Sequence, residues 1–368
     1  MSVQICYSAS NQFAPIQFFI TKRNVFMLLP KDTLVLVTGA TGFIANHIVL
    51  QLLEAGYRVR GTARSASSET ELRNVLSKHT EKINNFKLYE ANLEQDEGWE
   101  VAIEHCHYVI HAASPFPLKP PKHEDELIVP ARDGALRVLR VAAQQGVKRV
   151  IMTSSTAAII YGNERQQTFN EENWANTNSP KMGAYQKSKA LAERAAWAFM
   201  ESDEAQTLEL SVINPGLVLG PILGKDWGTS GELIRKFMNK EIPAIPNMGW
   251  ACVDVRDVAS AHISAMTEER AAGERFICAN EHASMRDIAT ILKEEFGHSY
   301  KIPTHSVPDF IVRFFALFNK EARITLNDLG VRQDVDNAKI KQILHWQPKS
   351  LKEMVIAMGN SLIEQKIV

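Results

Sequence analysis

Tyr185 is the only one of the seven tyrosines that is followed four residues later by a lysine, Lys189. The segment 184–200 has a helical pattern, and side chains four apart on a helix share one face, so the ammonium is expected beside the phenol. A free phenol has a pKa of about 10, too high for efficient proton exchange at neutral pH. Because a neighbouring cation favours the phenolate, the sequence predicts that Lys189 lowers the pKa of Tyr185 and makes it a general acid. A solvated helix face with the same spacing is the alternative.

Hydroxyl side chains follow the predicted strand 149–152, where Thr153, Ser154, Ser155 and Thr156 stand in a row. In doubly wound parallel sheets, ligands bind at the carboxyl ends of the strands. Ser155 is therefore expected to orient a carbonyl oxygen toward the Tyr185 proton. The alternative is a capping role at the end of the strand, which fits Ser154 better than Ser155.

A glycine-rich turn connects the first predicted strand to the first predicted helix, with the order Thr-Gly-Ala-Thr-Gly-Phe-Ile-Ala at residues 38–45. This spacing is a close variant of the dinucleotide-binding fingerprint. Gly39 allows the sharp turn, Gly42 lets the backbone approach a pyrophosphate, and Ala45 lets helix and sheet pack closely. The helix N-terminus adds free N–H groups and a partial positive charge. A turn with a purely structural role is the alternative.

The end of the second predicted strand distinguishes the two nicotinamide cofactors. NAD sites usually have an acid there, which binds the ribose 2′-hydroxyl. Residues 59–65 contain no acid but hold Arg60 and Arg64. Because a guanidinium can bind a 2′-phosphate through two parallel hydrogen bonds, the sequence predicts NADP(H) as the cofactor. Two solvated surface arginines are the alternative.

Short apolar runs alternate with helical patterns from Thr33 onward, which predicts a parallel sheet wrapped by helices on both faces. The expected strands are 34–37, 57–62, 86–89, 108–110, 149–152 and 208–213, and the expected helices are 43–54, 69–78, 127–145 and 184–200. The fold class is therefore α/β, a doubly wound Rossmann sheet with a smaller, mainly helical C-terminal substrate region.

The composition and the alternation of predicted strands and helices divide the chain into three parts. Residues 1–31 contain no acidic residue and are expected to be a disordered N-terminal extension. A start at Met27 is one alternative, and a mitochondrial presequence, which should be richer in Arg, is another. Residues 32–216 are expected to form the dinucleotide-binding domain. Residues 217–368 are expected to form the substrate-binding region, with some strands and helices that rejoin the Rossmann core.

These motifs together resemble the extended short-chain dehydrogenases/reductases, and most of all their dihydroflavonol-reductase-like branch, which includes fungal NADPH-dependent ketone, aldehyde and methylglyoxal reductases. The resemblance covers roughly residues 33–365. Its carriers are the turn 38–45, the segment His111-Ala112-Ala113-Ser114-Pro115-Phe116, Thr153-Ser154-Ser155, Tyr185 with Lys189, Asn214-Pro215-Gly216, and the segment 254–259.

The resemblance implies a role for each matching residue. Ser155 would bind the substrate oxygen, Tyr185 would protonate the alkoxide, and Lys189 would also hold the nicotinamide ribose. The residues that would contact the cofactor are Gly39, Thr41, Gly42, Phe43, Ile44, Arg60, Arg64, Asn92, Leu93, Ala112, Ala113, Ser114, Thr153, Tyr185, Lys189, Pro215, Leu217 and Val218. The residues that would line the substrate pocket are Phe116, Ile160 and Met182, the last two of which could equally be core residues.

Two positions depart from the family pattern. The family usually has Asp-Leu after the third strand, near the adenine, where this chain has Asn92 and Leu93. An amide can still donate and accept a hydrogen bond there, so a mild effect is expected. The family often has Asn after a Gly in the long fourth helix, whereas Gly134 is followed here by Ala135, so that contact is in doubt.

The predicted function is an NADPH-dependent carbonyl reductase that transfers hydride to a ketone or aldehyde, or oxidises the alcohol in reverse. A sugar-nucleotide epimerase or dehydratase of the same fold is one alternative. Such dehydratases usually have acids beside the strand-end hydroxyl, whereas residues 157–160 are apolar here. A non-catalytic NADP-sensing protein is another alternative, but such proteins tend to lose the tyrosine–lysine pair.

Charge and composition exclude several partners. The 41 basic and 42 acidic residues nearly cancel, which leaves no electrostatic footprint for nucleic acid or an anionic membrane. No apolar run reaches the ~18 residues that span a bilayer. The four cysteines form no C-x-x-C pair, and His105, Cys106 and His107 lack a second ligand cluster, so no metal site is expected. The protein is expected to be cytoplasmic, a monomer or homodimer, and to act on a small carbonyl or alcohol.

Overall fold

The computed structural model describes residues 29–115, 121–163, 168–280, 282–318, 326 and 328–368. The predicted extension lies outside the described residues except for its last three, and Pro30–Asp32 form a short 3-10 helix, η1. Phe116, a predicted pocket residue, also lies outside the described residues. Within the described ranges, no helix is long and apolar enough to cross a membrane. The same residues contain no group of three or more metal-ligating side chains.

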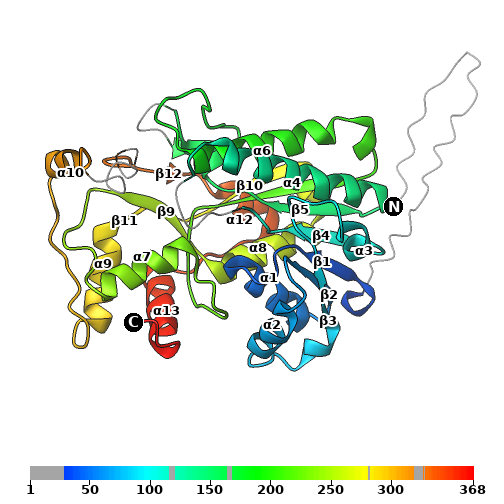
Figure 1. Ribbon diagram of the computed structural model, residues 1–368, viewed down its shortest axis with the longest axis horizontal. Helices are drawn as coiled ribbons and strands as arrows, with labels where there is room; N and C mark the ends of the chain where they lie inside the picture. The colour runs from blue at the N-terminus through cyan, green and yellow to red at the C-terminus, as the bar shows by residue number, and fades with distance from the viewer. Residues whose placement is uncertain (1–28, 116–120, 164–167, 281, 319–325, 327) are drawn as a thin grey trace, which may run out of the picture.

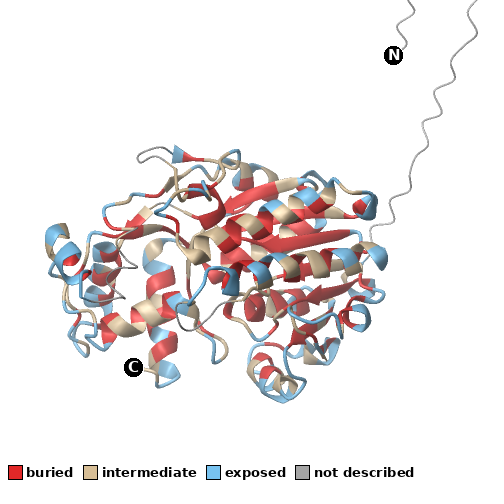
Figure 2. Ribbon diagram, turned by 45° about the horizontal axis from the view of Figure 1, so that its top comes forward, coloured by how far each residue is buried: buried red, intermediate tan, exposed pale blue. Residues whose placement is uncertain are grey.

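Seven parallel strands form the central sheet in the order β10-β7-β5-β4-β1-β2-β3 (Figure 1). They are β1 (Leu34–Val37), β2 (Arg58–Ala63), β3 (Phe86–Glu90), β4 (Tyr108–His111), β5 (Arg149–Thr153), β7 (Glu209–Pro215) and β10 (Glu274–Cys278). All four residues of β1 and all five of β5 are buried. Strands that are buried along their whole length are covered on both faces, as Figure 2 shows for this sheet.

Helices cover both faces of the sheet, and two separate core clusters mark the two sides. On one face lie α1 (Phe43–Glu54), α2 (Ser68–Leu76), α8 (Val255–Thr267) and α12 (Ala338–Leu344). On the other face lie α3 (Trp99–Ile103), α4 (Asp125–Gln144) and α6 (Ala184–Met200). The predicted doubly wound parallel sheet is therefore confirmed.

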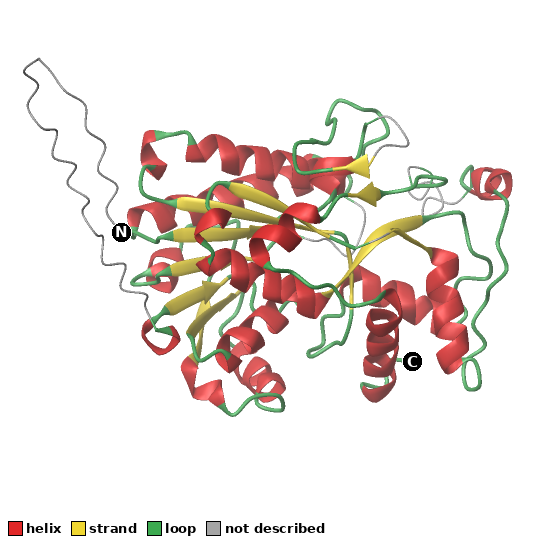
Figure 3. Cartoon of the chain, turned by 180° about the vertical axis from the view of Figure 1, so that it is seen from behind, coloured by secondary structure: helices red, strands yellow, loops and turns green. Residues whose placement is uncertain are grey.

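The chain leaves the main sheet after Gly216 and builds a second, smaller layer (Figure 3). Its sheet has the order β11-β9-β8, and a third core cluster joins it to the surrounding helices. The elements are β8 (Leu217–Leu219), α7 (Gly228–Met238), β9 (Gly249–Asp254), β11 (His282–Ser284), α9 (Met285–Phe296), α10 (Asp309–Phe315) and α13 (Leu351–Glu364). Capping boxes at Ser284 and Ser350 begin α9 and α13.

The order of the strands reverses at β1, which pairs with β2 on one side and β4 on the other. The crevice at such a switch point is where ligands bind in open α/β sheets. The glycine turn follows β1 and residues 112–114 follow β4, so both segments border this crevice. Ser155 follows β5, the next strand along the sheet.

Three buried histidines lie in this core, and burial lowers the pKa of His47, His111 and His262 to about 4. Each has a partner that suits a neutral ring. His47 Nε2 lies 2.8 Å from the Pro221 carbonyl oxygen, and His262 Nε2 lies 2.7 Å from the Thr153 hydroxyl. The folded protein therefore resists protonation at these rings, whereas the unfolded chain does not.

We expect the free energy of unfolding to fall as the pH drops from 6.5 toward 4. Above pH 6.5 both states have neutral rings, and below it only the unfolded chain gains protons. Each ring contributes on the order of 3 kcal/mol to this loss. Urea titrations at pH 7, 5.5 and 4.5 measure the effect, and the variant His262→Gln should show a shallower dependence. The same change at exposed His298 is the control. Equal stability at pH 7 and 4.5 would contradict the account.

Candidate active site

The glycine turn after β1 has the conformation that its sequence predicts. Gly39 has a φ of +63°, and a Cβ added there would lie 3.0 Å from the Cβ of Ala113. The positive φ favours glycine, and the close approach of Ala113 leaves little room for a side chain. The turn is closed by a hydrogen bond from the Gly42 N–H to the Gly39 carbonyl oxygen, with an N···O distance of 2.9 Å. The Gly39 N–H donates to the Thr62 hydroxyl of β2, which holds the turn against the neighbouring strand.

The N-terminus of α1 is uncapped, and the Asp226 carboxylate lies near it, 3.8 Å from where a Cβ at Gly42 would stand. Gly42 is its N-cap, no side chain caps the first turn, and that turn contains no acidic residue. Thr41 is exposed, Ile44 is partly buried, and Phe43 packs edge-on against His47. Uncapped N–H groups beside a glycine without a Cβ suit a phosphate group, so this part of the site fits a dinucleotide.

Residues 112–114 form the second wall of the crevice, at the end of β4. The Thr38 hydroxyl lies 2.9 Å from His111 Nδ1 and accepts a hydrogen bond from the Ala113 N–H. This contact ties the end of β1 to the end of β4. Ala112, Ala113 and Ser114 are all partly buried beside the glycine turn, as a predicted contact with the cofactor requires.

The turn after β3 is held by its own residues and by α4. Asn92 Oδ1 accepts a hydrogen bond from the Glu94 N–H, so this side chain shapes its own turn. A Cβ added at Gly134 would lie 2.9 Å from the Leu93 Cβ, so α4 packs closely on Leu93. Arg137 of α4 donates to the Leu93 carbonyl oxygen and pairs with Asp96. Arg137 therefore ties α4 to this turn, and the family contact that the departure at Ala135 put in doubt stays untested.

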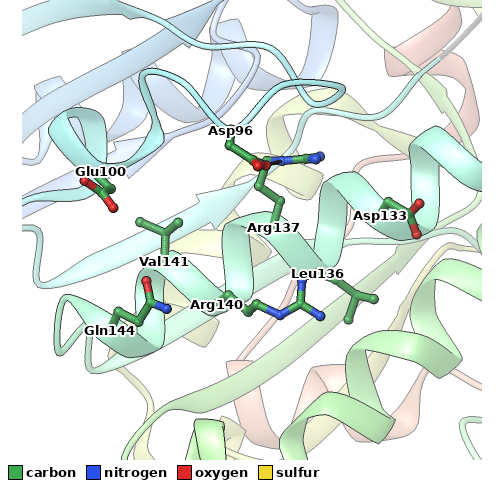
Figure 4. Close-up of a pocket in the computed structure, with 8 residues that line it drawn as sticks. All are labelled: Asp96, Glu100, Asp133, Leu136, Arg137, Arg140, Val141 and Gln144. Atoms are coloured by element: carbon green, nitrogen blue, oxygen red, sulfur yellow. Dashed lines mark hydrogen bonds and ion pairs between the residues drawn. The ribbon is translucent and has the colours of Figure 1, made fainter.

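A surface cavity lies between α4 and the segment that holds Asp96 and α3 (Figure 4). It is lined by Asp96, Glu100, Asp133, Leu136, Arg137, Arg140, Val141 and Gln144. None of the predicted site residues lines this cavity. Of its charged residues, Asp133, Arg137 and Arg140 stand on α4, Glu100 stands on α3, and Asp96 stands in the turn before α3.

The prediction that Arg60 binds the 2′-phosphate is wrong. Its Nη1 donates to the carbonyl oxygens of Val101, Ala102 and Glu104 at distances of 2.8–3.0 Å. Its guanidinium also lies over the Tyr89 ring, 4.9 Å from the centroid. Arg60 therefore caps the C-terminus of α3, where a cation complements the helix dipole. It stands three residues before the end of β2, so it does not reach the carboxyl edge of the sheet.

Arg64 is the arginine that remains available. It follows the last residue of β2, is exposed, and has no hydrogen-bond or ion-pair partner among the described residues. Two serines stand beside it, and the Ser65 and Ser67 hydroxyls lie 2.8 Å apart. Ser67 is the N-cap of α2 but makes no capping bond. These serines were not predicted as ligands, although their place at a helix N-terminus after a strand was the available signal.

Ser155, Tyr185 and Lys189 meet at the carboxyl edge of the sheet. Gly183 is the N-cap of α6, so Tyr185 lies in the first turn of this helix. The Ser155 hydroxyl hydrogen-bonds to the Tyr185 phenol, and it also accepts a hydrogen bond from the Ala157 N–H at 3.1 Å. Lys189 is buried, and its Nζ lies 5.9 Å from the centroid of the Tyr185 ring. The helical spacing of the pair thus places phenol and ammonium together, as predicted.

The predicted pKa shift of Tyr185 has the wrong sign. Burial raises the pKa of the phenol, and the hydrogen bond with Ser155 opposes this only in part. Burial also lowers the pKa of Lys189 to about 8, against the opposing charge of Glu193. The sequence shows that a cation is near the phenol but not that both groups lose water, and desolvation is the larger effect here.

The remaining predicted cofactor residues lie in or at the ends of β5, β7 and β8. Pro215 is buried at the end of β7, and Leu217 and Val218 are partly buried in β8 just beyond it. The Thr153 hydroxyl is directed inward to His262, so only the backbone of Thr153 could face a ligand.

Two predicted pocket residues are core residues. Ile160 packs in a cluster with Ile159 and Ile277, and Met182 packs in another with Ala158 and Ala190. Their apolar character is explained by this packing, so the expectation that they face a substrate is not supported. Sequence alone could not separate the two roles, because both select apolar side chains.

Four polar residues form a group behind the site that was not predicted as functional. Glu193 of α6 accepts hydrogen bonds from Ser154 and Asn214 and forms an ion pair with Arg275 of β10. All three of the partner side chains are buried. The spacing of Glu193 to Lys189, four residues, was the one signal that sequence reasoning could have used.

Known proteins resemble this chain over most of its length. The profile of the NAD dependent epimerase/dehydratase family matches residues 35–279. NADPH-dependent methylglyoxal reductase GRE2 of Saccharomyces cerevisiae is 32% identical over 356 residues, which cover 90% of this chain and 98% of that one. Cinnamoyl-CoA reductase CAD2 of Medicago truncatula is 33% identical, with 84% of this chain and 96% of that one covered.

A solved structure supports the same relationship. The crystal structure of yeast methylglyoxal/isovaleraldehyde reductase Gre2 complexed with NADPH superimposes with a TM-score of 0.74 and 28% identity, and the match covers 91% of this chain and 100% of that one. This chain belongs to the NAD-dependent epimerase/dehydratase family, the extended short-chain dehydrogenases/reductases, as its motifs predicted.

The variant Arg60→Met tests the corrected role of this arginine. Loss of its hydrogen bonds to the end of α3 should lower the free energy of unfolding by on the order of 2 kcal/mol. Dinucleotide affinity should stay within about twofold, because the side chain does not face the crevice. Urea denaturation and a fluorescence titration with dinucleotide measure the two quantities. Unchanged stability with strongly weakened binding would restore the original prediction.

Proposed function

We propose that this protein is an NADPH-dependent carbonyl reductase that reduces a ketone or aldehyde and runs in reverse as an alcohol dehydrogenase. One observation carries the proposal: Ser155 and Tyr185 are hydrogen-bonded to each other beside buried Lys189, at the carboxyl edge of the sheet. Two relatives named as reductases, one of them NADPH-dependent by its name, match nearly their whole length and support it.

The cofactor-binding residues follow from the crevice. The uncapped N-terminus of α1 would bind the pyrophosphate, and Arg64 with Ser65 and Ser67 would bind the 2′-phosphate. Lys189 would hold the nicotinamide ribose, with Pro215 beside the ring. When bound, NADP(H) supplies the hydride in reduction and accepts it in oxidation.

The protein's own groups handle the oxygen and the proton. The hydroxyls of Ser155 and Tyr185 donate hydrogen bonds to the substrate carbonyl oxygen and orient its carbon. As the carbon gains hydride, negative charge grows on the oxygen, and these preplaced donors stabilise it. The Tyr185 O–H bond then breaks and its proton passes to the alkoxide, which gives the alcohol. The Lys189 ammonium stabilises the phenolate that remains.

The pKa shifts suit the direction of reduction. Burial raises the pKa of Tyr185, so the phenol is protonated at neutral pH and ready to donate. With its pKa lowered to about 8, Lys189 is still mainly an ammonium at pH 7. A pair with these two charge states can protonate an alkoxide without first taking up a proton from water.

The family name also covers sugar-nucleotide epimerases and dehydratases. Residues 157–160, which follow Ser155, form the short helix α5 (Ala157–Ile160), and all four side chains are buried and apolar. No acid stands there beside the strand-end hydroxyl, which favours a carbonyl reductase. The intact Ser155–Tyr185–Lys189 group likewise favours an enzyme over an NADP sensor. We further expect a small-molecule substrate, a cytoplasmic location, and a monomer or homodimer.

The variant Tyr185→Phe tests the proton donor. Removal of the hydroxyl should lower kcat for NADPH-dependent reduction by about 10²–10³-fold, with NADPH affinity nearly unchanged. A panel of ketones, aldehydes and β-keto esters, followed by NADPH absorbance, gives the substrate for this assay. The control is Tyr57→Phe. Tyr57 packs against the core cluster on the face of the sheet that α1 covers. Wild-type turnover by Tyr185→Phe would remove the mechanism.

The variant Arg64→Met tests the choice of cofactor. Loss of a charge-assisted bond to the 2′-phosphate should weaken NADPH binding roughly ten- to hundredfold and leave NADH binding unchanged. Arg58→Met, at the exposed amino end of the same strand, is the matched control. The account fails here if Arg64→Met weakens both cofactors equally or neither.

A further inference from the structure

A buried ion pair lies directly behind the proposed catalytic residues. Glu193 of α6 has no exposed side-chain surface, and its Oε1 lies 2.7 Å from Nε of Arg275 in β10. Taking two charges out of water is costly, and replacing such a pair by apolar residues often leaves a protein equally stable. Fold stability alone therefore does not explain why a carboxylate stands at this place.

The second carboxylate oxygen of Glu193 holds the ends of two strands. Its Oε2 accepts a hydrogen bond from the Ser154 hydroxyl at 2.5 Å and another from the Asn214 amide at 2.7 Å. The Asn214 amide also donates to the Ser155 carbonyl oxygen at 3.1 Å. One carboxylate thus ties α6 to the end of β5, which carries Ser155, and to the end of β7, which carries Pro215.

Glu193 also acts on Lys189, which stands one helical turn earlier on the same face of α6. Its charge favours the Lys189 ammonium and opposes the effect of burial. The other titratable groups that interact with Lys189 are Tyr185, of the same helix, and His111, of β4. His111 is neutral at pH 7 because its pKa is about 4, so Glu193 is the group here that stabilises the cation.

Arg275 is anchored independently of the catalytic group. Its guanidinium lies over the Trp174 ring, 3.8 Å from the centroid. Its Nη1 donates to the carbonyl oxygens of Glu171 and Asn173. The cation is therefore held by the loop before α6, and it balances the charge of Glu193 from the side opposite the strand ends.

We propose that Glu193 is a positioning residue for the reaction: it holds the backbone of Ser155 through Ser154 and Asn214, and its charge stabilises the Lys189 ammonium. This inference rests on the proposed carbonyl reductase function. Glu193 contacts no reacting atom, so its effect on turnover passes through the Ser155 backbone and Lys189.

The variant Glu193→Gln keeps the size of the side chain and removes its charge. Misplacement of Ser155 should lower kcat about tenfold to a hundredfold, with KM changed less than about threefold. If activity requires the Lys189 ammonium, the alkaline fall in kcat should also move to lower pH by about one unit, since the pKa of Lys189 falls when the carboxylate is lost.

Two matched variants separate these effects from general destabilisation. Ser154→Ala removes one hydrogen bond and keeps the charge, so kcat should fall while the alkaline limb stays in place. Glu209→Gln breaks another ion pair with a buried arginine, Arg149, at the opposite ends of β5 and β7. It should lower the Tm and leave kcat and the pH profile unchanged. If Glu193→Gln does not fold, it is replaced in the assays by the double variant Glu193→Gln with Arg275→Gln. In that variant the arginine that would be left without its partner is also neutral.

A titration of the lysine itself decides the electrostatic part without any turnover. In protein labelled with 13C at the lysine Cε, the Lys189 resonance is assigned from the Lys189→Arg variant and followed from pH 6 to 11. We expect its midpoint to move down by about one unit in Glu193→Gln and to stay in place in Glu209→Gln. An unmoved midpoint together with wild-type kcat would overturn the proposal. A wild-type protein that reduces no carbonyl would instead overturn the proposed function, and the titration would still report on Glu193.

Discussion

The hydrogen bond between Ser155 and Tyr185 is the contact on which the rest of the site depends. It joins the segment just after β5 to the first turn of α6. Residues 154–183 separate these two elements in the sequence. The parallel sheet brings the ends of β1, β4 and β5 to one edge, and α6 must begin at Gly183 for the phenol to reach that edge. A shift of either element by one residue would separate the two hydroxyls.

Loss of water governs the electrostatics of this site more than the approach of charges does. The tyrosine is partly buried and the lysine is buried, and loss of water favours the neutral form of each, so the pKa of Tyr185 rises and that of Lys189 falls. The site nevertheless keeps a protonated phenol and a mainly charged ammonium at neutral pH. Glu193 contributes to this balance from within the core, and Arg275 extends the network to β10, which the chain forms after leaving and rejoining the main sheet.

Some helices and strands could be predicted from the sequence, because the spacing of their apolar residues matches the face that they bury. The bounds of β1, α1 and α6 match the expected ranges, and the glycine turn has the backbone that its spacing implies. β10 was not predicted, because its apolar run 276–279 is short and begins directly after the charged pair Glu274-Arg275, and the partner that balances Arg275, Glu193, is far away in sequence. Long-range partners of this kind leave no local signal.

The errors at the site have the same origin. The expected strand 57–62 already placed Arg60 inside the strand and Arg64 beyond it, but the partners that hold Arg60, the carbonyls at the end of α3 and the Tyr89 ring, come from distant segments. The sign of the Tyr185 shift depended on burial, and the packing of Ile160 and Met182 depended on neighbours from other segments. Spacing along one helix, as for Tyr185 and Lys189, was sufficient because both residues belong to the same element.

The most direct test of the central claim is a crystal structure of the protein with NADP+ and an alcohol product or a non-reactive ketone analogue. The account predicts that the ligand oxygen lies within hydrogen-bond distance of both the Ser155 and the Tyr185 hydroxyls, with Lys189 against the nicotinamide ribose. A ligand oxygen held by other groups, with the Tyr185 phenol directed away from it, would contradict the account.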